Sequence, residues 1–151
     1  IRDSSTSRGL GDVYKRQLED LAFIRELQPQ MIGIGPFIPH HATPFKNYPA
    51  GTLEQTLTLL SVLRLMFPKV LLPATTALGT IVPNGRELGI LAGANVVMPN
   101  LSPADVRQNY LLYDNKLCSG AEAAEAKNDL AARLHSIGYE IAEGRGDYKE
   151  S

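Results

Sequence analysis

Short apolar runs that stop in Pro, Thr, Asn or Gly alternate along the chain with segments of helix length. Apolar residues at helical spacing begin at Leu18 and stop near Gln28-Pro29, which predicts a first helix. Near-continuous apolar runs are typical of buried parallel strands. They predict strands at residues 31–38, 70–74 and 95–98.

The segments between these runs carry the start and stop signals of helices. A start signal is a capping residue followed three positions later by Glu or Gln, or a proline at the first helical position. The start signals are Thr52 with Gln55, Asn84 with Glu87, Ser102 with Pro103, and Ser119 with Glu122. The stop signals are Pro68, Gly93 and Gly138.

This alternation of helices and strands predicts an α/β fold with right-handed crossovers and parallel strands. A complete (β/α)8 barrel has eight such units in roughly 250 residues. Three strands are predicted here in 151 residues. We therefore expect the C-terminal part of a TIM-type barrel, with three parallel strands, flanking helices and a C-terminal helical extension. A small open α/β sheet is the other arrangement that fits the pattern.

Residues 1–17 differ from the rest of the chain. They lack apolar periodicity, are rich in Ser, Arg, Gly and Asp, and do not begin with Met. They look like translated adapter read-through at the end of a reading frame assembled from environmental DNA. We interpret them as a non-native, disordered leader, with residues 18–151 as the domain. The domain is then expected to be truncated at its N-terminus.

Composition excludes several classes of function. The net charge is −1 and no basic cluster stands out, which argues against a nucleic-acid partner. No apolar run approaches the ~20 residues of a membrane-spanning helix, so no membrane partner is expected. The single cysteine, Cys118, can form no internal disulfide and cannot alone hold a zinc or iron–sulfur site. We expect a cytoplasmic protein.

Three motifs carry a resemblance to a known family: GIGPFIPHHATP, PATTALGTIVPNGRE and GANVVMPN. From about Leu18 to the C-terminus the chain resembles the last part of the radical S-adenosylmethionine maturases of [FeFe] hydrogenase, the HydE type. It is more loosely similar to biotin synthase and methylornithine synthase. The resemblance implies that residues 18–151 hold strands six to eight of a (β/α)8 barrel and the C-terminal region associated with biotin and thiamin synthesis.

The resemblance also implies an activity for the whole enzyme. Members of this family cleave S-adenosylmethionine reductively to a 5′-deoxyadenosyl radical, which in the HydE type acts on a precursor of the hydrogenase diiron site. The implied cofactors are S-adenosylmethionine and a [4Fe–4S] cluster held by a CxxxCxxC loop. This chain has no such loop, so we expect it to be inactive alone. The implied partners are a small-molecule or iron-complex substrate and other hydrogenase maturation proteins.

Five candidate site residues follow from the resemblance. Pro36 and Ile38 match positions beside S-adenosylmethionine, Thr75 and Thr76 match an anion-binding part of the cavity, and Met98 matches a position facing the substrate. Adjacent strand residues point to opposite faces, so at most one of the two threonines should face the interior. The structural alternatives are strand termination and packing for Pro36 and Ile38, a loop cap for the threonines, and core filling for Met98.

Other assignments remain open or negative. His40 and His41 are adjacent, but no third ligand lies near them in sequence, so no metal site is expected. No catalytic residue is identified. Two other functions fit the sequence: a methylornithine synthase-like or biotin synthase-like radical enzyme, and a non-catalytic α/β module that binds a small ligand.

Overall fold

The computed structural model describes residues 10–98 and 123–148. The chain divides into two compact units, Ile1–Gln30 and Met31–Ser151. The predicted helix start at Ser102-Pro103, the start signal at Ser119 and the cysteine Cys118 lie outside the described residues.

The first unit contains helix α1, Leu10–Leu27. Its end agrees with the sequence: Gln28 adopts a left-handed conformation (φ 50°), and its N–H donates to the Ile24 carbonyl at 3.0 Å. It begins inside the segment interpreted as a leader, so residues 10–17 form its first turns in the structure. Most residues of this segment have moderate or good helix propensity, which is compatible with a helix here.

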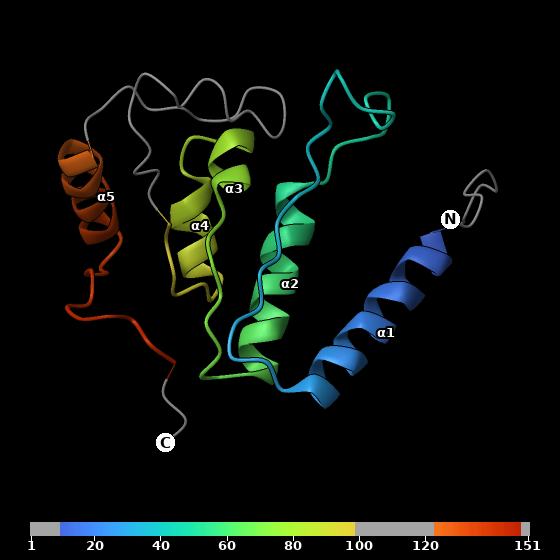
Figure 1. Ribbon diagram of the computed structural model, residues 1–151, viewed down its shortest axis with the longest axis horizontal. Helices are drawn as coiled ribbons and strands as arrows, with labels where there is room; N and C mark the ends of the chain where they lie inside the picture. Colours follow the sequence, from blue (N-terminus) through green and yellow to red (C-terminus); the bar gives the residue numbers. More distant parts are fainter. Residues whose placement is uncertain (1–9, 99–122, 149–151) are drawn as a thin grey trace. The chain divides into compact units, whose positions relative to one another are not determined.

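The second unit contains α2 (Leu53–Met66), α3 (Thr76–Ile81), α4 (Gly85–Leu91) and α5 (Ala123–Ser136), all drawn in Figure 1. The predicted cap of α2 is confirmed, because the Thr52 hydroxyl accepts the Gln55 N–H at 3.2 Å. Helix α3 is not anticipated by the sequence. It is a short turn of helix with β-branched residues at both ends and a glycine inside, so neither periodicity nor propensity marks it.

Two of the predicted helix stops are confirmed by the same hydrogen-bond pattern. Gly93 (φ 114°) follows α4, and the N–H of Ala94 donates to the Gly89 carbonyl at 2.9 Å. Gly138 (φ 82°) follows α5, and the N–H of Tyr139 donates to the Leu134 carbonyl at 3.0 Å. Both ends therefore have the six-to-one bond of a Schellman motif, which requires a left-handed residue just past the helix.

The three predicted strands are extended segments that lie side by side, next to α2 and α4 (Figure 1). No regular strand is present among the described residues. The segments are joined only by isolated parallel bridges, Met31 with Leu71 and Pro73 with Val96. The prediction of three regular strands is therefore wrong, although their parallel direction is right and residues 70–74 lie between the other two segments.

Two local features explain why a longer ladder does not form. Pro73 has no N–H to donate. The neighbouring N–H of Leu72 donates to a side chain, the Oδ1 of Asn95, at 2.8 Å instead of to a carbonyl of the adjoining segment. Only Ala74 N–H to the Val96 carbonyl, at 2.8 Å, continues the backbone pairing beyond this point.

Burial alternates along the first segment. Ile32 and Pro36 are buried, whereas Met31, Gly35 and Phe37 are exposed. Alternate residues of an extended chain point to opposite faces, so one face of the paired segments is covered. The core on that side is apolar, and its fully buried side chains are Leu60, Leu63, Leu72 and Leu78. We call the exposed side, with Met31, Gly33, Gly35 and Phe37, the open face.

Arg64 of α2 forms a hydrogen bond with the turn that follows α4. Its Nε donates to the Gly93 carbonyl at 2.8 Å, and its Nη1 donates to the Pro68 carbonyl at 2.7 Å. A Cβ on Gly93 would lie 2.7 Å from Arg64 Cβ, so this position needs glycine for space as well as for its backbone conformation. Partial burial lowers the pKa of the Arg64 guanidinium from its usual value.

The hydrogen bond from the Leu72 N–H to the Asn95 side chain takes the place of a backbone hydrogen bond between strands, and its contribution to stability can be measured. Leu72 is 0% exposed, so removing the acceptor in Asn95→Ala leaves a buried N–H without a partner. We expect a loss of about 1–3 kcal/mol in the free energy of unfolding, measured by urea denaturation. Asn95→Asp keeps the oxygen and should stay much closer to wild type. Equal losses in the two variants would show that the hydrogen bond is not the cause.

Candidate functional site

Thr75 stands at the point where the middle segment turns into α3. It occupies the N-cap position of that helix with extended backbone (φ −70°, ψ 157°), but its side chain makes no capping hydrogen bond. Its Oγ1 is buried and has no hydrogen-bond partner among the described residues. An unpaired buried hydroxyl is uncommon in proteins and costs stability, so Thr75 is the unusual residue of this region.

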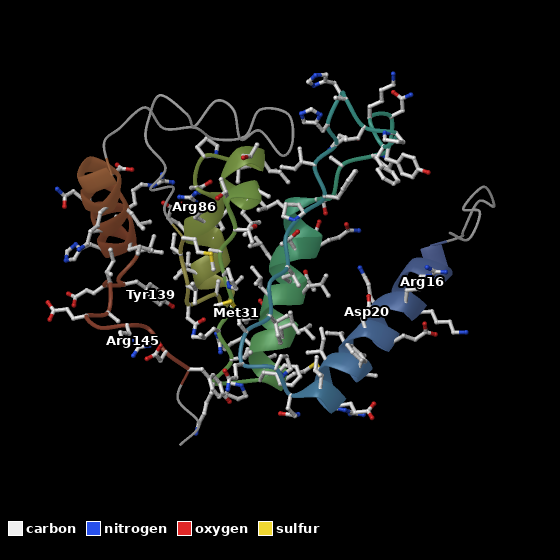
Figure 2. The ribbon with its side chains drawn as sticks, viewed as in Figure 1. Arg16, Asp20, Met31, Arg86, Tyr139 and Arg145 are labelled. Carbon is white, nitrogen blue, oxygen red and sulfur yellow. The ribbon has the colours of Figure 1, made fainter. Side chains whose placement is uncertain are left out.

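Thr76 is placed differently. Its hydroxyl accepts a hydrogen bond from Nη2 of Arg86 at 3.2 Å, and its carbonyl accepts the Thr80 hydroxyl at 3.1 Å. Figure 2 shows Arg86 on α4. The two threonines, which the sequence does not distinguish, therefore differ in chemistry: one hydroxyl serves a contact between α3 and α4, and the other is unpaired.

The three apolar candidates do not share one face. Pro36 is buried and Ile38 is half-buried. Both therefore lie on the covered face with Ile32, opposite the open face. Met98 ends the third segment and is 55% exposed. Pro36 and Ile38 are therefore packed against the protein and Met98 is largely exposed, and the binding roles of all three residues stay predictions.

The two ends of the loop after the first segment are joined by a backbone hydrogen bond. The N–H of Gly51 donates to the Phe37 carbonyl at 2.8 Å. Inside the loop, the rings of His40 and His41 stack with centroids 4.4 Å apart, and Nδ1 of His40 accepts the Ala42 N–H at 3.1 Å. His40 is thus engaged in the loop's own hydrogen bonds. In the part of the chain that the structure describes, no three His, Cys, Asp or Glu residues gather as metal ligands.

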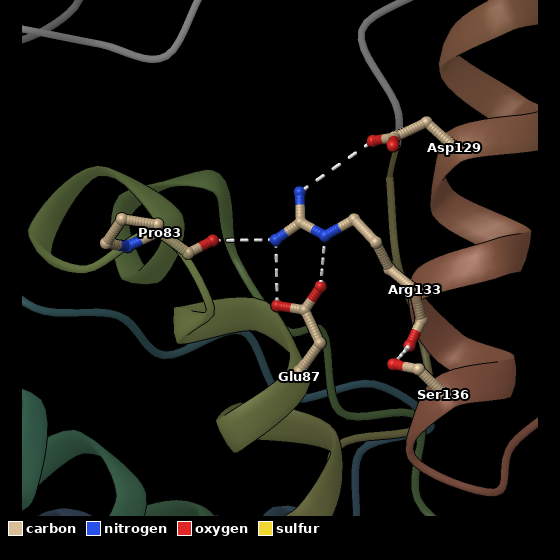
Figure 3. A network of polar contacts seen from close by, with 5 residues as sticks. All are labelled: Pro83, Glu87, Asp129, Arg133 and Ser136. Atoms are coloured by element: carbon tan, nitrogen blue, oxygen red, sulfur yellow. Dashed lines mark hydrogen bonds and ion pairs between the residues drawn. The ribbon is translucent and has the colours of Figure 1, made fainter.

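A partly buried ion pair between α4 and α5 is not predicted by the sequence (Figure 3). Arg133 donates through Nε to Oε1 of Glu87 and through Nη2 to Oε2 at 2.9 Å. The same Nη2 donates to the Pro83 carbonyl at 2.6 Å. The Glu87 side chain is 9% exposed. The sequence assigns Glu87 only to the helix start, because the two partners lie 46 positions apart and no local spacing signals such a pair.

An open groove of about 530 Å³ borders this ion pair on α4 and α5. Leu88 and Leu91 supply apolar lining, and Asn84 and Ser136 supply polar groups. None of the five candidate residues lines it. We therefore place the candidate site at the ends of the extended segments, around Thr75, and not in this groove.

The comparisons with known proteins agree with the motifs. The chain is 48% identical over 101 residues to the [FeFe] hydrogenase maturase subunit HydE of Thermotoga maritima, a match that covers 67% of this chain and 29% of the maturase. It is 33% identical over 109 residues to the 3-methylornithine synthase of Methanosarcina barkeri, covering 72% of this chain and 31% of the synthase. The synthase of Methanosarcina acetivorans is 28% identical over 134 residues, covering 89% and 37%.

These matches confirm the predicted resemblance: the chain is similar to radical S-adenosylmethionine proteins of the HydE type. It spans between 29% and 37% of the length of these relatives. The similarity implies a fold of the TIM-barrel family. No family profile matches the sequence. Among the described residues, no helix is long and apolar enough to cross a membrane.

The Glu87–Arg133 pair leads to a stability test. Arg133→Met leaves a buried carboxylate without its partner, and we expect it to lower the free energy of unfolding by about 3 kcal/mol. Asp129→Ala is the matched control, because that carboxylate is 70% exposed and lies 3.9 Å from Arg133 Nη1. The double variant Glu87→Met with Arg133→Met should recover much of the loss. A double variant as unstable as the sum of the two single changes would contradict this account.

Proposed function

We propose that this chain forms part of a radical S-adenosylmethionine enzyme of the HydE type, in which it contributes one wall of the cavity for S-adenosylmethionine and substrate. The observation that carries the proposal is the 48% identity to a [FeFe] hydrogenase maturase subunit over two-thirds of the chain. The unpaired hydroxyl of Thr75 supports it from the structure, because it lies where parallel segments end, the usual place for binding residues in such folds.

The residues of this chain are compatible with binding S-adenosylmethionine but not with holding a [4Fe–4S] cluster. Pro36 and Ile38 offer apolar surface, and in our proposal they flank S-adenosylmethionine. A [4Fe–4S] cluster does not fit the described residues, which bring no three ligands together, and the sequence holds one cysteine. The cluster ligands of the proposed enzyme therefore lie outside this chain, and we derive no step through the cluster.

Thr75 is our choice for the anion-binding hydroxyl. The Thr76 hydroxyl already accepts a hydrogen bond from Arg86, whereas that of Thr75 has no partner among the described residues. The anion would be a carboxylate or a similar acceptor, and the exposed thioether of Met98 would lie on the substrate side. The proposed substrate is a small molecule or an iron complex on the route to the diiron site, handled together with other maturation proteins.

A 3-methylornithine synthase-like activity is the second candidate. The match to the Methanosarcina acetivorans synthase covers 89% of the chain, more than the match to the maturase. The two activities differ in substrate and share the radical chemistry that the resemblance implies. The maturase remains our first proposal because its identity to this chain is higher.

A chimera tests the function and the threonine assignment together. The last part of the Thermotoga maritima maturase is replaced by residues 18–151 of this chain, and maturation of [FeFe] hydrogenase is measured. We expect activity in the chimera and a ten- to hundredfold loss in Thr75→Val, because a hydrogen bond to a charged group contributes roughly 1.5–3 kcal/mol. Thr76→Val should keep the activity but lower the stability, since it removes an acceptor from Arg86.

Stability provides an internal control for this experiment. Thr75→Val removes an unpaired buried hydroxyl, so the variant should be as stable as the parent or more stable. An active chimera in which Thr75→Val has full activity would show that this hydroxyl does not bind the anion. A chimera inactive in maturation but able to replace the same part of a 3-methylornithine synthase would favour the second candidate. Inactivity in both enzymes would favour a non-catalytic ligand-binding module.

The chain alone is expected to be inactive. Incubation with iron, sulfide, a reductant and S-adenosylmethionine should yield no 5′-deoxyadenosine, because radical initiation needs an electron from a cluster that this chain has no set of ligands to hold. The measurement is the 5′-deoxyadenosine formed per chain, with the intact Thermotoga maritima maturase as positive control. Stoichiometric product together with a bound cluster would refute our placing of the cluster ligands elsewhere.

A further inference from the structure

Gly33 and Gly35 lie on the same open face but have different surroundings. Neither has a positive φ, so the backbone at these positions does not require glycine. A Cβ on Gly33 would meet nothing within 4 Å. A Cβ on Gly35 would lie 2.8 Å from Oγ1 of Thr75, which is closer than such contacts allow. The missing side chain at Gly35 therefore makes room for one particular atom, the hydroxyl oxygen of Thr75.

The position of this hydroxyl is unusual for its place in the chain. Thr75 is the N-cap residue of α3, where threonine ordinarily turns its oxygen toward the first N–H groups of the helix. Here the N–H of Leu78 donates to the backbone carbonyl of Thr75 at 3.1 Å, and the hydroxyl turns toward Gly35 instead. It remains buried and without a partner among the described residues.

We propose that Gly35 is a positioning residue that keeps the Thr75 hydroxyl uncapped and directed to the open face. The inference rests on the proposed function, in which this hydroxyl donates to a carboxylate or similar anion. Staggered rotamers leave Thr75 few choices, and a Cβ at position 35 removes the one observed. The hydroxyl would then turn away from Gly35, and a rotamer that caps α3 would satisfy it internally.

The small size of Gly35 also affects how a ligand would reach the Thr75 hydroxyl. Gly35 is exposed, so a ligand on the open face meets the chain beside Thr75. The oxygen is covered in the structure, so a ligand would have to displace the atoms that cover it. A side chain at position 35 would lie within 2.8 Å of the same oxygen and would block this approach.

The test uses the whole 151-residue chain and sodium acetate as the carboxylate probe, with sodium chloride at the same ionic strength as the blank. The χ1 rotamer of Thr75 is read from three-bond NMR couplings, and acetate affinity from the shift of its methyl group. In Gly35→Ala we expect a different χ1 rotamer and about tenfold weaker acetate binding. The matched control Gly33→Ala, made on the same face with open space around it, should change neither quantity.

The possible outcomes separate this inference from the function on which it rests. No acetate binding by the wild-type chain, or unchanged affinity in Thr75→Val, overturns the proposed anion site and this inference with it. Wild-type rotamer and affinity in Gly35→Ala overturn only the role of Gly35. If Gly35→Ala does not fold, the pair Gly35→Ala with Thr75→Ser relieves the crowding, since serine has no γ-methyl group and can turn its hydroxyl away from position 35 more easily. That pair should fold and bind acetate weakly, and wild-type affinity in it would refute the proposal.

Discussion

Residues 70–74 form the middle extended segment, and the rest of the second unit depends on how their backbone groups are hydrogen-bonded. The segment is largely buried, so its polar groups need partners inside the protein. The Leu71 carbonyl accepts the Ile32 N–H at 2.9 Å, which fixes the first segment. The Leu72 carbonyl accepts the N–H groups of both Asn95 and Val96, which fixes the third. Proline at position 73 removes one donor from this arrangement, and the Asn95 amide oxygen satisfies the donor beside it. The register of all three segments is thereby set over a few residues, without a long ladder.

This register explains why the candidate site lies where it does. Fixing the first segment against the middle one brings Gly35 beside Thr75, far apart in sequence but adjacent across the pairing. Helices α4 and α5 then contribute hydrogen bonds near the end of the middle segment. Arg86 on α4 engages the Thr76 hydroxyl, and the next residue, Glu87, is bound by Arg133 of α5. Two neighbouring residues of one short helix thus connect the start of α3 to α5. The Thr75 hydroxyl stays outside this polar network, and this is the reason that we propose it, and not Thr76, as the hydroxyl that binds a ligand.

The sequence predicts the elements that depend on local chemistry and misses those that depend on distant partners. The Thr52 cap and the glycine stops at 93 and 138 are confirmed because a few adjacent residues determine each of them. The extended segments and their parallel direction follow from apolar runs alternating with helices. Regular strands were predicted wrongly because the partner of the Leu72 N–H is a side chain of another segment. The Glu87–Arg133 pair has no sequence signal at all.

The choice between Thr75 and Thr76 shows what the structure adds to similarity. A resemblance assigns both threonines to an anion site, and alternation along a strand says only that they should point to opposite faces. The structure separates them by hydrogen bonding: a hydroxyl that accepts from a guanidinium contributes to the fold, and a buried hydroxyl without a partner costs stability. Valine in place of Thr75 would remove this cost, because it buries a methyl group where threonine buries the hydroxyl, and the cost is therefore the observation on which our proposed binding role for Thr75 rests. Because a Cβ on Gly35 would meet the Thr75 hydroxyl oxygen, the two positions are sterically coupled, and a substitution at either one should be interpreted through its effect on the other.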